Sequence, residues 1–442
     1  MNENVDVPKK KKKSIGLEYD IKESLAWVTG IGTCEDADLV IPTTTEEGYK
    51  VIGIRGFAFE NCKSIISVVV PKTVEIIEGC AFSNCINIKS VKLHYGLKEI
   101  WGFAFENCTS LTSISIPSSV INIGNTPKKE ISPEERMLRA IFGEKSDVGS
   151  GNPFKGCKKL RSIKVNSGNL RYCDYINCLI DKQNKIIVSG CKTSILPGDD
   201  RAETIGDYAF YDCGDAFKNG LYIFETPKIK VIKAFAFSKC NIEKLFFPNT
   251  LIRIECSAFR DCSDIKEIVF PSTLMDIGWN AFEGCTKLYK IEYPCQIECI
   301  GLEAFKDCHN LTIVTYNDLS RIVTILPGTY SGCTSLSVVN LPQKLEEICC
   351  YAFSDCKNLQ KIVFPSNLKV IGKESFASCE HLRDVFIPKS VENIDADAFL
   401  DCWPWLEEIH CETNIKPENW NPNWNRKRDY GTYHEVVWSA KE

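Results

Sequence analysis

The chain has 442 residues, a formal net charge of −5 and 25% charged residues. No long block of like charge follows the lysines at residues 9–13, and this balance makes nucleic acid a poor default partner. No apolar run approaches the roughly eighteen residues that a membrane-spanning helix needs, and residues 1–14 lack the apolar core of a secretory signal. We therefore expect no transmembrane segment and a cytoplasmic location.

The N-terminal part of the chain divides into a tail and a cap. Residues 1–14 are rich in lysine and predict a disordered tail, whereas residues 15–54 predict a cap and the first coil of a repeat. In the cap, alternating apolar residues at 17–21 are followed across a short polar turn by the apolar run 26–31, which indicates a β-hairpin. Such an end piece would shield the apolar cross-section of the coil that follows it.

Residues 55–411 repeat one segment, of which residues 100–117 are a clear copy. The template reads Ile-Gly-x-x-Ala-Phe-x-x-Cys-x-x-Leu-x-x-Ile-x-Ile-Pro. Neighbouring template cysteines such as Cys262 and Cys285 are 23 residues apart, and a fixed period in the twenties indicates a solenoid rather than a closed globule. Thirteen template cysteines mark thirteen predicted coils: Cys62, Cys85, Cys108, Cys157, Cys213, Cys240, Cys262, Cys285, Cys308, Cys333, Cys356, Cys379 and Cys402.

Each coil is predicted to contain one strand and one short turn. Leu111, Ile114 and Ile116 alternate with polar residues, as in a β-strand whose apolar side chains face inward, and the proline that follows ends the pairing. Phe105 and Cys108 have the spacing of a single helical or 3-10 turn. We therefore predict an α/β repeat solenoid, with a parallel sheet on one face and short helical or 3-10 turns on the other.

Two insertions interrupt the repeat. Residues 125–151 predict a helical insertion, because a capping-box start at 132–135 precedes an apolar stripe at 137–142. Residues 166–206 predict a protruding hairpin insertion, because two apolar runs flank the polar turn at 182–185. Both insertions fall in neighbouring coils, so we expect a bulky shoulder at this point of the repeat.

Residues 412–442 abandon the repeat and predict a tryptophan-rich C-terminal cap. Trp420, Trp424 and Trp438 could form a platform on which a sugar ring stacks, or they could form a lid over the last coil. We favour the lid, because the open end of a solenoid exposes apolar surface that requires covering.

The chain has 24 cysteines, thirteen of which belong to the repeat. At the repeat position a thiol is most simply a small buried group that meets the backbone of the adjoining turn, and we expect these thiols to be reduced. Cys295 with Cys299, and Cys349 with Cys350, are the nearest candidates for a metal site, yet neither pair has partners at zinc-finger spacing. No phosphate loop stands out, and neither does a catalytic pairing of the five histidines. We predict no catalytic residue, no metal site and no cofactor; a thiol- or zinc-dependent protein is the alternative.

The outward-facing strand positions are informative, since the repeat does not dictate them. From about the sixth coil onward they expose apolar side chains between charged ones, and strands about 4.8 Å apart make a strip long enough for a partner protein. β-branched and aromatic residues also favour strands wherever they lie, so β propensity alone explains the strip equally well. The residues predicted to bind a protein or peptide partner are Phe246, Val269, Ile313, Val338, Lys361, Val363, Asp384 and Phe386.

The template resembles the repeat unit of the BspA-like, or Treponema pallidum-type, leucine-rich repeat family, over about residues 30–412. Other parts also resemble bacterial members of this family: residues 16–19 with 28–34, residues 177–180 with 189–192, and the closing motif at 420–425. The resemblance implies a leucine-rich-repeat solenoid that binds proteins without catalysis. It also implies a role in adhesion or host interaction, because members often act as surface adhesins, and so a cell-surface or secreted location becomes an alternative to a cytoplasmic one.

Overall fold

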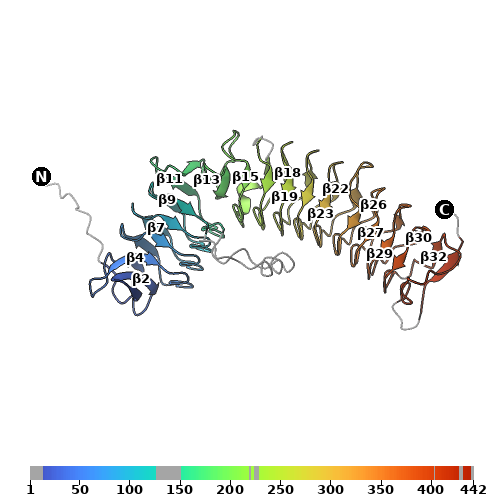
Figure 1. Cartoon of the computed structure of the whole chain (residues 1–442), viewed down its shortest axis with the longest axis horizontal. Coiled ribbons are helices and arrows are strands. Elements are labelled where there is room, and N and C mark those ends of the chain that lie inside the picture. Colours follow the sequence, from blue (N-terminus) through green and yellow to red (C-terminus); the bar gives the residue numbers. More distant parts are fainter. Residues whose placement is uncertain are drawn as a thin grey trace. The chain divides into compact units, whose positions relative to one another are not determined.

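A computed structural model of the chain describes residues 13–125, 151–218, 221–222, 228–402, 404–427 and 432–439 (Figure 1). They belong to two compact units, Met1–Ile195 and Leu196–Glu442. Each unit is a parallel β-solenoid, and the described residues make about 16 turns with almost no helix. Residues 1–12 of the predicted tail and residues 126–150 of the predicted helical insertion lie outside the described residues.

The first unit is built on two ladders of strands. One sheet has the order β1 (Glu18–Lys22), β2 (Leu25–Gly30), β4 (Lys50–Ile54), β6 (Ile76–Ile77), β8 (Glu99–Ile100) and β10 (Asn122–Ile123). The other ladder contains β3 (Asp38–Val40), β5 (Ser67–Val70) and β7 (Ser90–Leu93), and then β9 (Ser113–Ile116), which pairs with β11 (Ser162–Val165). Strands β1 and β2 pair antiparallel, but β2 also pairs in parallel with β4. The prediction of a separate hairpin cap is therefore wrong, because β2 is itself a strand of the solenoid ladder.

Residues 166–206 carry an antiparallel meander of β12 (Tyr172–Tyr175), β13 (Cys178–Asp181) and β14 (Ile186–Ser189). Leu179 and Ile180 are fully buried, so β13 packs inward instead of standing free in solvent. The hydroxyl of Tyr172 accepts a hydrogen bond of 2.9 Å from the amide of Ile123. This bond fastens the meander to the solenoid coil that precedes it.

The second unit repeats the two-ladder plan with a more regular period. Its ladder of short strands contains β15 (Thr204–Ile205), β17 (Val231–Ile232), β19 (Arg253–Ile254), β21 (Asp276–Ile277), β23 (Cys299–Ile300), β25 (Thr324–Ile325), β27 (Glu347–Ile348), β29 (Val370–Ile371) and β31 (Asn393–Ile394). Its ladder of longer strands contains β16 (Leu221–Tyr222), β18 (Lys244–Phe246), β20 (Glu267–Val269), β22 (Lys290–Glu292), β24 (Ile313–Thr315), β26 (Val338–Asn340), β28 (Lys361–Val363), β30 (Asp384–Ile387), β32 (Glu408–Cys411) and β33 (Glu435–Trp438). We call the outward side of strands β18 to β32 the sheet face.

The prediction of helical or 3-10 turns opposite the sheet is wrong. In these segments the backbone amides alternate between two kinds of partner: Ala258 bonds to Glu255 in its own coil, whereas Phe259 bonds to Ala281 in the next coil at 2.8 Å. Ser257 and Asp261 have left-handed φ angles of 54° and 59°. A helix needs right-handed angles and amides that bond within the segment, so the chain forms successive turns linked from coil to coil. We call this surface the turn wall; among the described residues a 3-10 helix, η1 (Gly214–Phe217), occurs just outside the repeated turns.

The repeat phenylalanines and cysteines form two buried columns inside each solenoid. Phe259 and Phe282 stack with their ring centroids 5.3 Å apart, and both are fully buried. The thiol of Cys262 donates a hydrogen bond of 3.0 Å to the carbonyl of Phe237 in the preceding coil. Burial raises the pKa of Cys262 well above its ordinary value. The predicted contact of the repeat thiol with the adjoining turn is therefore confirmed.

The tryptophans near the C-terminus lie over the last coil. Trp420 and Trp424 are 1% and 2% exposed and meet edge to face with ring centroids 5.2 Å apart. Trp424 also contacts the ring of Phe399 at 6.1 Å. The pair is a buried lid, and its rings are not available as an exposed platform for a sugar.

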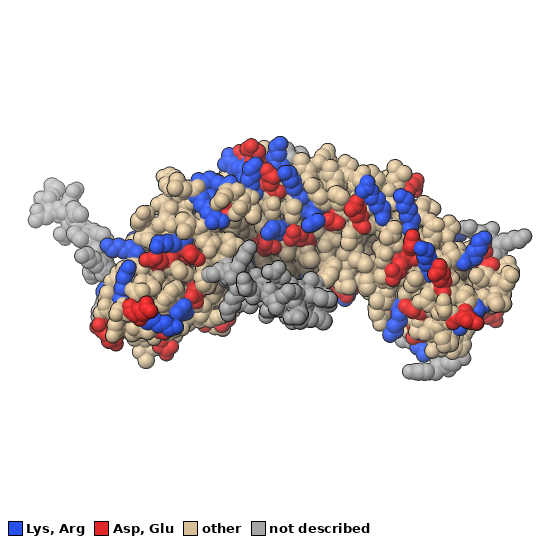
Figure 2. Space-filling model, in the orientation of Figure 1, with Lys and Arg blue, Asp and Glu red and all other residues tan. Residues whose placement is uncertain are grey.

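The charged side chains of both solenoids are interspersed. Figure 2 shows basic and acidic groups side by side over much of the face in view. Several pairs join equivalent positions of neighbouring coils, such as Lys98 with Glu75 at 2.6 Å and Lys369 with Glu346 at 2.7 Å. Within the described ranges, no helix is long and apolar enough to span a membrane.

Candidate partner-binding face

The sheet face presents two columns of outward side chains on either side of a buried one. In each strand the central residue points inward, and Leu245, Ile362 and Val385 are at most 2% exposed. The outward residues are in register, since Lys361 lies opposite Asp384 and Val363 lies opposite Phe386. The first column contains Lys244, Glu267, Lys290, Ile313, Val338, Lys361, Asp384 and Glu408; the second contains Phe246, Val269, Glu292, Thr315, Asn340, Val363, Phe386 and His410.

All eight residues predicted to bind a partner lie on this face, in three groups. Phe246 is paired in register with Val269, and Ile313 is paired with Val338. The third group, Lys361, Val363, Asp384 and Phe386, surrounds one depression. The first two groups are separated by β22, where Lys290 and Glu292 form an ion pair of 2.5 Å.

The outward apolar side chains of these groups are exposed or half-buried, whereas the central column of each strand is buried. Val269, Val338 and Val363 are 47%, 45% and 55% exposed. Phe246, Ile313 and Phe386 are half-buried, and Lys361 and Asp384 are exposed. Burying apolar area of this kind against a partner is favourable, because it removes the area from water.

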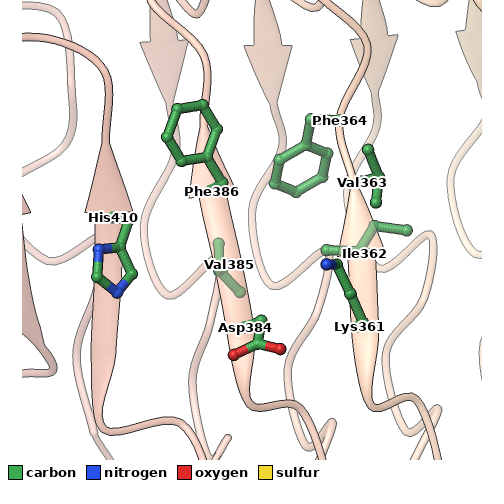
Figure 3. Close-up of a pocket in the computed structure, with 8 residues that line it drawn as sticks. All are labelled: Lys361, Ile362, Val363, Phe364, Asp384, Val385, Phe386 and His410. Carbon is green, nitrogen blue, oxygen red and sulfur yellow. The ribbon is translucent and has the colours of Figure 1, made fainter. Parts of the chain in front are cut away.

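The depression spans strands β28, β30 and β32 and has a volume of about 310 Å³. Figure 3 shows that it has an apolar end and a charged end. The rings of Phe364 and Phe386 lie near Val363 at one end of the strands, and the side chains of Lys361 and Asp384 lie at the other. A partner side chain that enters it would meet an apolar surface and two opposite charges at fixed positions.

The charged end of the depression differs from the rest of the first column. Elsewhere in this column Lys244 pairs with Glu267 at 3.4 Å. Lys361 and Asp384 are also neighbours in register, yet neither forms an ion pair with any residue that the structure describes. Each charge is therefore available to a group of opposite charge on a partner.

Sequence reasoning missed four of the residues that line the depression. His410 lies at an outward position of the second column, so the strand alternation could have included it. Ile362, Phe364 and Val385 are buried residues that lie at the floor of the depression. Strand alternation alone gives no signal for them.

Among the described residues, the cysteines outside the repeat belong to no cluster of metal-ligating side chains. Within this part of the chain, no group of three or more histidine, cysteine or acidic side chains could hold a metal ion. Cys299 is exposed, and Cys349 and Cys350 are half-buried. Burial raises the pKa of Cys349 to about 12, so its thiol stays protonated and weakly nucleophilic at neutral pH.

Two solved structures share this fold over most of their length. A leucine-rich repeat protein from Bacteroides ovatus is 22% identical, with 91% of this chain and 94% of that chain covered and a TM-score of 0.55. One from Eubacterium ventriosum is 21% identical, with 75% of this chain and 80% of that chain covered and a TM-score of 0.51. No curated protein matches the chain.

The sequence model of the BspA type leucine rich repeat region matches six copies, over residues 52–175, 188–312 and 314–419. These ranges cover well over half of the chain, and they agree with the coils that the two ladders define. The repeat cysteine, its stacked phenylalanine and the inward strand residues all lie within them. The chain is therefore a member of the BspA type leucine rich repeat family.

Proposed function

We propose that this chain is a non-enzymatic interaction module that binds a protein partner, through an extended segment of that partner, on the sheet face of its second unit. The depression between Lys361, Val363, Asp384, Phe386 and His410 carries the proposal. It combines exposed apolar surface with two charges that the fold leaves without ion-pair partners among the described residues. A partner segment with an apolar side chain next to a charged one would satisfy both.

Preorganisation supports this role. Strands β28, β30 and β32 pair with one another in register, and β33 continues the pairing beyond β32, so the outward side chains keep a fixed spacing of about 4.8 Å between coils. A binding surface that is already ordered loses little conformational entropy when the partner arrives. The exposed residues on β20 and β26 would extend the contact beyond the depression.

We also propose that this binding serves adhesion or host interaction at a cell surface. The support is the resemblance of the repeat to the surface adhesins of the BspA-like family. Protease treatment of intact source cells tests the location: an exposed protein is cleaved on intact cells, whereas an internal one is cleaved after lysis alone. Sparing on intact cells would refute the adhesion role and leave the binding proposal standing.

The binding proposal is tested with peptides of known sequence. A phage-displayed random peptide library is selected on the wild-type protein, and the dissociation constants of selected peptides are measured by calorimetry. The variant Val363→Lys with Phe386→Lys replaces the apolar end of the depression with charge, and we expect it to weaken binding at least a hundredfold. The matched control, Ser90→Lys with Ser113→Lys, adds the same charges to exposed outward positions of the first unit and should bind as wild type.

Two further variants examine the charged end of the depression. Lys361→Ala and Asp384→Ala should each weaken the same peptides by about 1 kcal/mol or more, since each removes one partner of a desolvated charged contact. Thermal melts of all variants should remain within a few degrees of wild type, because the substituted side chains point outward. Selected peptides that bind the double lysine variant as tightly as wild type would refute the proposal.

A further inference from the structure

The turn wall of the second unit has one coil in which a regular side chain is missing. Most coils place a residue with a left-handed φ angle directly before the template's alanine, and that residue carries a side chain. Gly328 occupies this position in the coil that follows Cys308, with a φ angle of 63°. The equivalent residues in the other coils of the second unit are Tyr208, Phe235, Ser257, Asn280, Glu303, Tyr351, Glu374 and Asp397.

The missing side chain opens a notch of about 400 Å³ in the turn wall. Gly328 and Ser331 belong to the central coil, Glu303 and Lys306 to the coil before it, and Tyr351 to the coil after it. Because neighbouring coils lie about 4.8 Å apart, the notch is about two coil spacings wide. Its volume is within the range of small-molecule sites.

The groups on one side of the notch are held in place. The ammonium of Lys306 lies 2.8 Å from a carboxylate oxygen of Glu303, and the side-chain amide of Asn280 donates to the other oxygen of Glu303 at 2.9 Å. These bonds lower the pKa of Glu303 against the opposing effect of its burial. This side of the notch therefore presents an ionised acceptor and an ammonium donor together.

The other side of the notch offers an aromatic ring and a second acceptor. Tyr351 is 39% exposed, and its hydroxyl donates to Glu374 at 3.4 Å in the coil beyond, away from Gly328. Asp355 is exposed, and its carboxylate has no hydrogen-bond or ion-pair partner within the described part of the chain. This side therefore combines apolar ring surface with a free acceptor.

This combination discriminates between classes of ligand. Lys306 is paired with Glu303, so a cation would gain only the attraction of Asp355, and an anion would be repelled by Glu303 and Asp355. Hydroxyl groups, in contrast, both donate and accept, so they can bond to the carboxylates and to the ammonium at once. A molecule with several hydroxyl groups and an apolar C–H surface could also cover the ring of Tyr351. We propose that the notch at Gly328 binds a neutral saccharide.

Saturation-transfer NMR on the full chain tests the proposal with methyl glycosides of glucose, galactose, mannose and N-acetylglucosamine. We expect transfer to at least one of them, with at least a tenfold loss of affinity in Tyr351→Ala and little change in Tyr351→Phe, which keeps the ring. Gly328→Tyr fills the notch with the residue that the next coil carries at a similar φ angle, and it should abolish transfer. Circular dichroism verifies that each variant is folded.

Three outcomes would overturn the proposal: no transfer to any glycoside, transfer that survives in both Tyr351→Ala and Gly328→Tyr, or binding of arginine amide or acetate in preference to the sugars. The sheet face supplies an independent control. Gly328→Tyr changes the turn wall, so it should leave the affinity for selected peptides unchanged, whereas Val363→Lys with Phe386→Lys should leave saccharide binding unchanged.

Discussion

Three buried tyrosine hydroxyls in the second unit allow a sharp test of how this core is stabilised. The hydroxyl of Tyr330 lies 2.9 Å from that of Tyr293 and 2.7 Å from that of Tyr316. Tyr330 takes the place of the repeat phenylalanine, and its ring stacks 5.3 Å from Phe353. All three tyrosines are at most 4% exposed. Tyr330→Phe therefore removes the shared partner of two buried hydroxyls and leaves the ring in the stack.

The expected loss follows from the two orphaned groups. A buried polar group without a partner destabilises a fold by about 1–3 kcal/mol, so the two groups orphaned in Tyr330→Phe should lower the free energy of unfolding by about 2–6 kcal/mol. Tyr316→Phe orphans no hydroxyl, because Tyr330 keeps its bond to Tyr293, and it should lower that free energy by about 1 kcal/mol. The triple variant with phenylalanine at 293, 316 and 330 removes every member of the network and should be more stable than Tyr330→Phe.

Urea denaturation followed by circular dichroism measures these differences, with the transition midpoint and slope compared between variants. The order of stability is the critical result: wild type and the triple variant above Tyr330→Phe. If Tyr330→Phe were as stable as wild type, or if the triple variant were the least stable, the three hydroxyls would not form the network that the distances indicate.

Three further predictions concern other parts of the chain. Burial lowers the pKa of His434, so the unfolded state binds more protons than the folded state. The contribution of neutral His434 to stability should be complete above about pH 6.5 and should decline below it. His434→Gln should remove this pH dependence from a thermal melt followed by tryptophan fluorescence. A methyl group added at Gly53 would lie 2.2 Å from the ring of Trp27, so Gly53→Ala should destabilise the first unit by about 1–3 kcal/mol in thermal denaturation; an unchanged melt would mean that the indole moves freely. In the native protein, iodoacetamide should modify the exposed Cys256 well before the buried Cys262, as peptide mass spectrometry can show, and equal rates would contradict the burial of the repeat thiols.

The strand half of each coil could be predicted from the sequence, whereas the turn half could not. The alternation at Leu111, Ile114 and Ile116 has the period of a strand, and all three side chains are buried. The spacing of Phe105 and Cys108 fits a helical turn and a pair of linked turns equally well, because it does not reveal that alternate amides bond to the next coil. A signal was nonetheless present: the residue before the repeat cysteine is often asparagine or aspartate, types that tolerate left-handed φ angles.

The candidate site was predictable as a surface and not as a shape. Strand alternation placed Lys361, Val363, Asp384 and Phe386 on one face, as the structure shows. The depth of the depression depends on how Phe364 packs beneath its neighbours, and that depends on three coils at once. Local pattern carries no information on such packing. The notch, in contrast, could be predicted from the sequence. Alignment of the repeats shows Gly328 at a position where the other coils carry a side chain.

The hydrogen bonds between coils on the turn wall have a mechanical consequence. Amides such as those of Phe259 and Asp261 bond to the neighbouring coil, so these bonds lie along the direction in which the coils succeed one another. A pulling force in that direction loads them directly, and the outermost coil yields first because it has a neighbour on one side alone. Each 23-residue coil that detaches releases roughly 80 Å of chain, so stretching of the regular coils would proceed in steps of similar length and absorb work at every step.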